Sequence, residues 1–422
     1  MPPKRRRRAL LLVENLSVPF DPRVWREARA LREAGLDVTV VSPQGQDRDT
    51  EPEAVVDGVV IRRFPLPQSD GSPVGFIREF VTACWRALRL AWKERPFDVV
   101  HAANPPDLLF AVALPFRLLG AKFVFDQHDL APELYEGRFE RRGPLYWLLR
   151  LSEQISYRLS SLVISTNETY RRAALRRGRK SPDEVVVVRN GPELSRFGHV
   201  PPDERLKRGK RHLLAYLGVM GPQDGVDLAI QALARLRDLR EQDDWHAVFI
   251  GDGESFSSVT TLAHELELDE RITFTGFLGD ELLTYLSTAD LGLVPDPKIS
   301  INDQSTMNKV MEYMASGSPI VSFDLSENRF SAQEAAVYVT GNDTDAFAGA
   351  IDRLLDDPGR RAEMAEYGRR RVAEELSWER SKVRLARAYR DVLGLDMALP
   401  GEPPERQRAA PEVELDREAA VR

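Results

Sequence analysis

Apolar and polar residues follow one another along this chain in blocks that predict a repeated strand–loop–helix order. Residues 9–43 have the pattern of a buried strand, a polar loop, an amphipathic helix closed by Gly35, and a second buried strand. This order predicts a parallel sheet, because parallel strands need a crossover connection that is usually helical. Further buried strands are expected at residues 57–64, 97–103, 121–126, 161–166 and 184–191. The first half therefore predicts one α/β domain, residues 1–195.

A second series of the same kind follows a charged segment punctuated by Pro and Gly, residues 196–211, which we interpret as a linker. Its strands are expected at residues 212–218, 245–253, 271–277, 290–296 and 320–323. We assign residues 212–376 to this second domain, 377–395 to a last helix, and 396–422 to a Pro-rich charged tail that cannot form a core. The fold class is α/β, with two Rossmann-like sheets that face each other across a cleft.

The stretch 298–323 has the clearest helical period in the second domain. An apolar stripe at three- and four-residue spacing predicts a helix that starts at Thr306, is capped by Ser305 or Thr306, and ends at Gly317. The stripe consists of Met307, Val310, Met311 and Met314. A polar loop, a helix start and a following strand form the crevice in which open α/β sheets bind nucleotides.

Two charged side chains of this helix carry candidate chemistry. Glu312 is placed to accept both hydroxyls of a ribose, and Lys309, nearly one turn earlier, to meet a phosphate. The plain alternative for Glu312 is a solvated carboxylate on a helix surface.

A histidine follows the strand expected at residues 121–126, in the sequence DQHDLAPELY. His128 lies between Asp126 and Asp129, and a neutral imidazole there can donate to a sugar hydroxyl while a carboxylate fixes its tautomer. A purely structural histidine is the alternative. The neighbouring loop, NPPD, adds Asn104 and Asp107 at the same edge of the sheet.

Residues 75–95 form an amphipathic helix that suits two roles. Arg86, Arg89 and Lys93 lie beside Trp85 and Trp92, which is the composition of a helix at a membrane surface. The same pattern fits a crossover helix that packs on the sheet.

Composition supports two domains and excludes several classes of function. The 422 residues are 42% hydrophobic, enough for two cores. A single cysteine, Cys84, excludes an intramolecular disulfide framework and fits a reducing cytoplasm. Six scattered histidines have no metal-ligand spacing, so we expect neither a metal nor a cofactor.

Charge is divided unevenly between the two halves. The first 200 residues carry about +7 and the remainder about −14, which gives −7 in total. The acidic total argues against a nucleic-acid binder, and the basic first half favours an anionic partner such as a membrane surface. No apolar run approaches the roughly 18 residues of a membrane span.

Residues 9–395 resemble, in order and spacing, the family-4 retaining glycosyltransferases, which have the GT-B architecture. The most specific matches are NDQSTMNKVMEYMASGSPIVSFD and FDQHDLAPELY. The resemblance implies a nucleotide-sugar donor bound between the domains and a C-terminal helix that returns to the first domain. It also implies a glycan or lipid-linked acceptor of envelope or surface-polysaccharide synthesis, and a cytoplasmic protein that contacts the inner face of the membrane.

The resemblance assigns roles to residues of this chain. In the family, the second Glu of a Glu–x7–Glu pair holds the ribose, and this role falls on Glu312. Gln304 takes the first position, with Asp303 beside it as a catalytic candidate. The histidine that approaches the donor sugar near its anomeric carbon falls on His128. Further donor contacts are expected from Gly218, Met220, Phe277 or Leu278, Ser305, Thr306 and Asn308, and acceptor contacts from Asn104, Asp107, Asp129 and Glu133.

The chain departs from the family where the donor diphosphate binds. The family has an Arg and a Lys there, whereas this sequence has Val219 or Met220 and Asp224. The first loop, ENLSVPFDPRV, also lacks the Gly-Gly pair of many members. We therefore expect the positive charge to come from Lys298, Lys309 and Arg23, together with backbone N–H groups at Gly218.

Two other readings of the same architecture stay open. One is a different enzyme class, such as a nucleotide-sugar 2-epimerase or a glycogen-type phosphorylase. The other is a non-catalytic module that binds a nucleotide sugar in the cleft without turnover.

Overall fold

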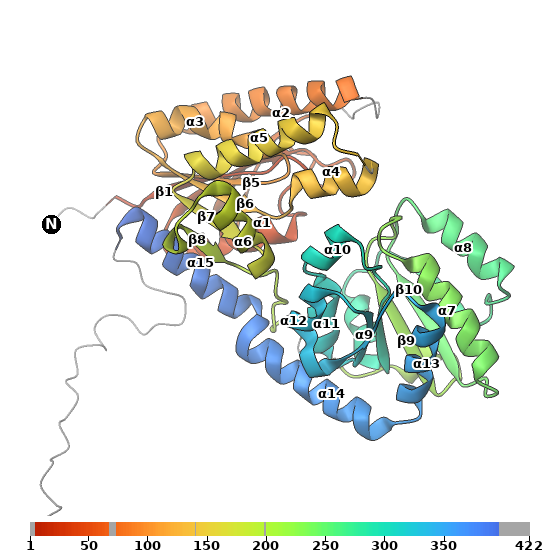
Figure 1. The fold of residues 1–422 in the computed structure, drawn as a ribbon. Coiled ribbons are helices and arrows are strands. Elements are labelled where there is room, and N and C mark those ends of the chain that lie inside the picture. The colour runs from red at the N-terminus through yellow and green to blue at the C-terminus, as the bar shows by residue number, and fades with distance from the viewer. Residues whose placement is uncertain (1–4, 67–72, 140, 198–199, 396–422) are drawn as a thin grey trace, which may run out of the picture.

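The computed structural model describes residues 5–66, 73–139, 141–197 and 200–395. It places two α/β domains side by side, joined by a long helical return at the C-terminus (Figure 1). The tail expected at residues 396–422 lies outside the described residues.

Eight strands form the first sheet, in the order β3-β4-β2-β1-β5-β6-β7-β8. All neighbours are parallel except the β3–β4 pair. The strands are β1 (Arg8–Leu12), β2 (Asp37–Pro43), β3 (Glu53–Val56), β4 (Val59–Phe64), β5 (Val99–Ala103), β6 (Lys122–Gln127), β7 (Leu162–Ser165) and β8 (Val185–Val187). The central strands are buried on both faces, which is why they consist of continuous apolar runs.

Helices cover both faces of this sheet. α1 (Pro22–Glu33) and α15 (Trp378–Leu393) pack on one face. The helices of the opposite face are α2 (Pro73–Glu94), α3 (Phe110–Leu118), α5 (Pro144–Leu159) and α6 (Glu168–Gly178). The short helix α4 (Ala131–Phe139) follows the loop that carries His128. Asp21 starts α1, because its carboxylate accepts the backbone N–H groups of Arg23 and Val24.

The helix expected at residues 75–95 is present as α2, and small residues form its buried face. Ala83, Ala87 and Ala91 pack on the sheet, whereas Val81 and Trp85 are 62% and 58% exposed. Alanine lets the helix lie close to the strands, so the larger apolar side chains are left on the outer surface.

Six parallel strands form the second sheet, in the order β11-β10-β9-β12-β13-β14. They are β9 (His212–Leu217), β10 (Trp245–Ile250), β11 (Ile272–Gly276), β12 (Leu291–Val294), β13 (Ile320–Phe323) and β14 (Ala336–Val339). The helices are α7 (Val226–Leu239), α8 (Phe256–Glu265), α9 (Glu281–Thr288), α10 (Ser300–Gln304), α11 (Asn308–Ser316), α12 (Ser326–Ala332), α13 (Thr344–Leu355) and α14 (Pro358–Arg371).

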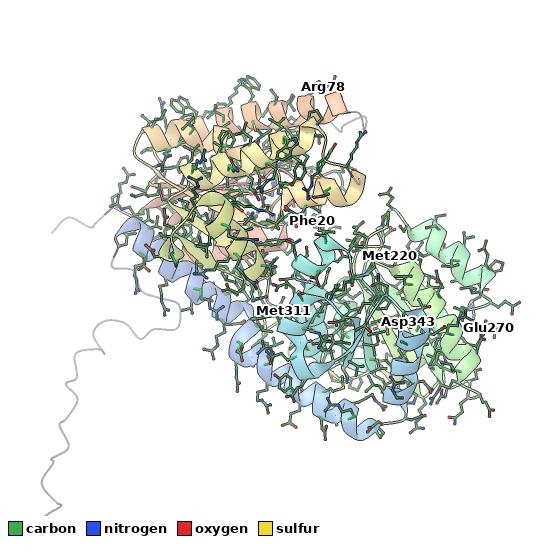
Figure 2. The ribbon with its side chains drawn as sticks, in the orientation of Figure 1. Phe20, Arg78, Met220, Glu270, Met311 and Asp343 are labelled. Atoms are coloured by element: carbon green, nitrogen blue, oxygen red, sulfur yellow. The ribbon has the colours of Figure 1, made fainter. Side chains whose placement is uncertain are left out.

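Side chains fill the space between the layers of this domain (Figure 2). Met220 and Met311 are fully buried, whereas Glu270 and Asp343 lie on the surface.

The helix expected from Thr306 begins later, at Asn308, and residues 300–304 form the separate short helix α10. Neither Ser305 nor Thr306 caps α11, because both side chains contact the first domain instead. Gly317 ends the helix in the left-handed conformation, as the sequence predicts.

The end of the chain crosses from the second domain to the first. α14 continues through a π turn, Val372–Leu376, into α15. Trp378, Leu385 and Tyr389 of α15 join the core of the first domain, and the crossing is visible in blue in Figure 1. Two facing Rossmann-like sheets with a returning C-terminal helix confirm the predicted GT-B fold.

Candidate functional site

Loops from both sheets approach each other where the strand order reverses. β1 lies between β2 and β5 in the first sheet, and β9 lies between β10 and β12 in the second. Open α/β sheets bind ligands at such switch points. Helix α10 contacts α4 across the domain boundary, so it forms part of the junction.

Asn104 shapes the loop that carries His128. Its Oδ1 accepts the backbone N–H groups of His128 (2.6 Å) and Asp129 (3.1 Å), and its Nδ2 donates to Asp107 Oδ1 (2.7 Å). Asn104 and Asp107, both predicted as acceptor contacts, are each only 2% exposed. The structure therefore gives them a different role: they hold the loop from within.

His128 is fixed by a buried ion pair. Its Nε2 is hydrogen-bonded to Asp126, and Asp126 also accepts both Nε and Nη2 of Arg23, at 3.1 and 2.7 Å. Arg23 is 4% exposed and donates further to Val188 O and Asn190 Oδ1. Its guanidinium is thus used inside the first domain, and this corrects the expectation that Arg23 binds a donor phosphate.

Of two acidic residues near His128, Glu133 has an ion-pair partner among the described residues and Asp129 does not. The carboxylate of Glu133 is bound by Arg177, with 3.1 Å from Nη1 to Oε2. The side chain of Asp129 makes no hydrogen bond or ion pair with any described residue. Burial raises the pKa of Asp129, and the nearby His128 lowers it in part. Of the predicted acceptor contacts, Asp129 is the one whose side chain remains available beside His128.

Glu312 faces a cavity of about 680 Å³ that both domains line. Asn308, one turn earlier on α11, and Leu278 line it from the second domain, and Phe20 and Arg26 line it from the first. The Glu312 side chain makes no hydrogen bond or ion pair within the described part of the chain. Burial raises its pKa, although Arg26, Arg196 and Lys309 act in the opposite direction. A partly desolvated carboxylate without a partner is available to hydroxyl donors.

Lys309 is committed to an ion pair. Its Nζ lies 3.1 Å from both carboxylate oxygens of the buried Asp296 and 3.4 Å from Tyr216 Oη. Burial lowers the pKa of Lys309, but Asp296 and Tyr216 more than compensate, so the net shift is upward and the ammonium stays charged. Gly218 lies against it: a Cβ there would be 3.4 Å from Nζ. The Lys309 ammonium therefore lies beneath the Gly218 loop, paired with Asp296. We had expected it to bind a phosphate directly.

The loop predicted to face the donor sugar is an interdomain contact. Asn167 Nδ2, at the start of α6, donates to Gln304 O (2.9 Å) and Thr306 Oγ1 (3.1 Å). Tyr170 Oη lies 3.0 Å from Ser305 Oγ. These hydrogen bonds join the two domains directly.

Four further predicted site residues are not among those that line the Glu312 cavity. Both carboxylate oxygens of Asp303 accept hydrogen bonds from Ser326, at the start of α12, and a catalytic role for Asp303 stays a prediction. Lys298 Nζ donates to Asp324 O (2.8 Å). Met220 is a core residue with no exposed surface, and Phe277 is 73% exposed, outside the set that lines the Glu312 cavity.

Sequence reasoning missed the residues of the first domain that hold the second. Besides Asn167 and Tyr170, Thr169 Oγ1 donates to Glu327 Oε1 (2.8 Å), and Arg189 lies 3.6 Å from Glu327 Oε2. The one available signal was Asn167 directly after the strand at 161–166, in a position suited to a helix N-cap.

Two family profiles match the chain. Residues 21–191 match the "Glycosyl transferase 4-like domain" and residues 211–357 match "Glycosyl transferases group 1". The first match covers the first domain from α1 to β8, and the second covers all strands of the second sheet. The chain belongs to glycosyltransferase family 4.

Curated relatives agree with this family membership. A D-inositol 3-phosphate glycosyltransferase of Salinispora tropica is 32% identical over 229 residues, which span 49% of this chain and 46% of that protein. An MMP alpha-(1->4)-mannosyltransferase of Mycolicibacterium hassiacum is 26% identical over 83% of this chain and 89% of its own length. The chain thus spans about half the length of the first relative and most of the second.

Among solved structures, the sucrose-phosphate synthase of Thermosynechococcus elongatus has a TM-score of 0.74 at 18% identity. The similarity covers 92% of this chain and 100% of that chain. At this level of identity it establishes the GT-B fold and nothing further about the reaction.

Proposed function

We propose that this glycosyltransferase moves a hexosyl group, with retention at the anomeric carbon, from a nucleotide sugar to an acceptor hydroxyl. The observation that carries the proposal is the cavity between the domains, where Glu312 presents an unpaired carboxylate. The ribose would bind Glu312, the base would lie towards Leu278, and the sugar would extend towards His128.

The reaction would depend on placement and electrostatics. Negative charge develops on the leaving diphosphate, and preorganised dipoles stabilise such charge when water is excluded. The N-terminus of α11, where Asn308 lines the cavity, supplies positive potential on one side, whereas the charge of Lys309 is balanced by Asp296. His128, with Nε2 bound to Asp126, is the group placed to hydrogen-bond the transferred sugar.

The experiment is incubation of the purified protein with a panel of UDP-, GDP- and ADP-sugars, with and without acceptors. D-inositol 3-phosphate belongs in the panel because of the Salinispora relative's name. GDP-mannose belongs there because another relative is a GDP-mannose-dependent alpha-(1-6)-phosphatidylinositol monomannoside mannosyltransferase of Mycolicibacterium smegmatis. Acceptor-dependent release of nucleotide with an α-linked product supports the proposal. An isomerised donor would indicate an epimerase, and phosphate-dependent turnover would indicate a phosphorylase. Binding of the nucleotide sugar without any product would indicate a sensor.

We further propose that the acceptor is a glycan or lipid-linked intermediate of envelope polysaccharide synthesis, reached at an anionic membrane surface. The α2–α3–α5 surface is the set of large apolar side chains exposed on these helices. It comprises Val81, Trp85, Trp92, Leu118, Leu119, Trp147, Leu148 and Leu151.

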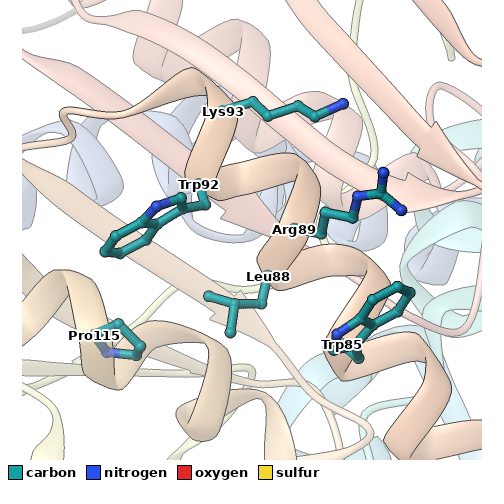
Figure 3. Close-up of a pocket in the computed structure, with 6 residues that line it drawn as sticks. All are labelled: Trp85, Leu88, Arg89, Trp92, Lys93 and Pro115. Atoms are coloured by element: carbon teal, nitrogen blue, oxygen red, sulfur yellow. The ribbon is translucent and has the colours of Figure 1, made fainter.

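Basic groups accompany the aromatic side chains of this surface. Trp85 and Trp92 flank a shallow apolar pocket of about 450 Å³, with Arg89 and Lys93 at its edge and Pro115 of α3 opposite (Figure 3). Arg95 lies 4.2 Å from the centre of the Trp92 ring. Amphipathic aromatic rings beside exposed cations match the headgroup region of an anionic bilayer. No helix among the described residues is long and apolar enough to cross a membrane, so attachment would be peripheral.

Vesicle sedimentation tests this contact, with phosphatidylglycerol-containing and pure phosphatidylcholine vesicles. Replacing both Trp85 and Trp92 by Ser should weaken binding to anionic vesicles about tenfold or more. Replacing Arg89 and Lys93 by Gln should cost about 1 kcal/mol each and reduce the salt dependence. Leu239→Ser, at a 57% exposed leucine of α7 in the second domain, is the matched control. Equal loss in the control, or no binding by the wild type, would contradict the membrane contact.

A further inference from the structure

A buried polar cluster of five residues lies behind His128, where four segments of the chain meet. Arg23 and Glu27 come from α1, His101 from β5, Asp126 from β6 and Tyr389 from α15. The five are between 0% and 4% exposed. Nothing in the reaction proposed above uses His101 or Tyr389. Burying two polar side chains costs free energy of desolvation unless their polar atoms are hydrogen-bonded.

One oxygen connects the members of the cluster. Asp126 Oδ2 accepts Arg23 Nε at 3.1 Å and the Nε2 of His128, and His101 Nε2 lies 3.4 Å from it. The same His101 nitrogen is also 3.4 Å from Glu27 Oε2. The atom that orients His128 is therefore the atom that faces His101.

Tyr389 determines which nitrogen of His101 carries the proton. Its hydroxyl lies 2.6 Å from His101 Nδ1, and the two rings stack with centroids 6.2 Å apart. When the hydroxyl donates to Nδ1, the ring proton must be on Nε2, which lies 3.4 Å from one carboxylate oxygen each of Asp126 and Glu27 without a hydrogen bond to either. With the other tautomer, a lone pair on Nε2 would face the Asp126 carboxylate and repel it.

We propose that Tyr389 and His101 are positioning residues that hold Asp126, and through it the ring of His128, in one orientation and one tautomer. His128 then keeps its proton on Nε2. Its Nδ1, which has no hydrogen-bond partner among the described residues, accepts a hydrogen bond from a sugar hydroxyl rather than donating one as the sequence predicted. The inference rests on the proposed function of His128. It makes α15, the helix that arrives from the second domain, part of the support of the reaction centre.

The charges of the cluster are consistent with this arrangement. Burial raises the pKa of Glu27, Arg23 lowers it and Asp126 raises it, with a net upward shift that favours the neutral acid. Burial has the opposite effect on the pKa of His101, which it lowers, so the neutral ring is favoured there as well. Burial raises the pKa of Asp126, but Arg23 and His128 hold it well below the usual range. One guanidinium and one carboxylate thus balance each other in a dry site.

A metal ion is the alternative occupant of this cluster. Glu27, His101 and Asp126 offer ligand atoms within 4.8 Å of one another. Arg23 argues against an ion, because its guanidinium already bridges Asp126 and lies 3.1 Å from Glu27 Oε1. A second cation there would have to displace it.

The experiment compares full-length wild type, Tyr389→Phe and Tyr157→Phe, each labelled with 15N-histidine. Long-range 1H–15N spectra report which ring nitrogens are protonated, and His128→Gln assigns the His128 signals among the six histidines. Tyr157 is the matched control: it is equally buried, and its hydroxyl bonds Gln127 (2.6 Å) without contacting His101. Melting curves of the three proteins check that each is folded.

We expect the wild type to show His128 protonated on Nε2. Tyr389→Phe should produce a mixture of His128 tautomers and lower kcat about tenfold while the donor Kd stays unchanged. Tyr157→Phe should leave the His128 signals in place. Unchanged His128 signals in Tyr389→Phe, or equal changes in both variants, would overturn the proposal. Displacement of the His101 signals by added Zn²⁺ would overturn it in favour of a metal site. A tautomer change without any transferase activity would instead refute the proposed function alone.

Discussion

At the scale of single residues, we propose that donor binding depends on Glu312. Glu312→Gln keeps the shape of the side chain and removes the charge. We expect donor affinity to fall by about 1.5–3 kcal/mol, the usual contribution of hydrogen bonds to a charged group. Titration calorimetry with the preferred nucleotide sugar measures the loss. Glu281→Gln, an exposed acid in the first turn of α9, is the control. Unaltered affinity in Glu312→Gln would remove the ribose assignment.

Asp107 gives the stability of the first domain a pH dependence. Burial raises the pKa of Asp107 to about 7, Asn104 lowers it, and Glu153 raises it further. The folded protein therefore binds a proton that the unfolded chain releases above its ordinary pKa near 3.8. This contribution to stability is complete below pH 4 and is lost as pH rises to about 7, at roughly 1.4 kcal/mol per pH unit.

Asp107→Asn should flatten this dependence. The amide cannot ionise, and its oxygen can still accept the hydrogen bond from Asn104 Nδ2. Melting temperatures followed from pH 5 to pH 8 should fall less steeply with pH in the variant than in the wild type. Parallel curves would mean that Asp107 does not titrate in this range.

At the scale of elements, the start of α6 and the α10–α11 segment hold the domains together. Asn167→Asp keeps the oxygen that caps α6 and loses the Nδ2 donor to Gln304 and Thr306, and Tyr170→Phe loses the contact with Ser305. The double variant should lose about 2 kcal/mol of local stability, so the segment opens roughly 30-fold more often. Limited proteolysis within residues 298–307 measures this opening, with Thr260→Ala in α8 as control. An unchanged cleavage rate would show that the contacts are not limiting.

The elements show where sequence reasoning succeeds and where it ends. The stripe Met307–Met314 and the stop at Gly317 predicted α11, because both are local properties of the chain. The partners of Lys309 and Arg23 could not be predicted, since Asp296 lies in the loop after β12 and Asp126 lies in β6. A cation in the first turn of a helix suits a phosphate and a buried carboxylate equally well, and only the fold decides between them. The same holds for Asp303, whose partner Ser326 lies on the far side of β13 in the sequence.

At the scale of the whole molecule, the spacing of strands predicted the two sheets, whereas the return of the C-terminal helix was implied by the resemblance to the family. The cavity at Glu312 could not be predicted from the sequence, because Phe20 and Arg26 line it with Glu312 only once both domains have folded. The net charge of the chain divides between the same two halves. The basic half carries the α2–α3–α5 surface, and the acidic half carries α11, which we propose to bind the donor.

The crossing of α15 has a practical consequence for anyone who wishes to express the halves of this protein separately. A gene cut at the linker would leave the first sheet without Trp378, Leu385 and Tyr389, and the apolar groups beneath them would meet water. Such a fragment should aggregate, whereas one in which the last helix is grafted after residue 195 through a flexible spacer should remain in solution. The boundary of the folding unit is therefore discontinuous along the chain.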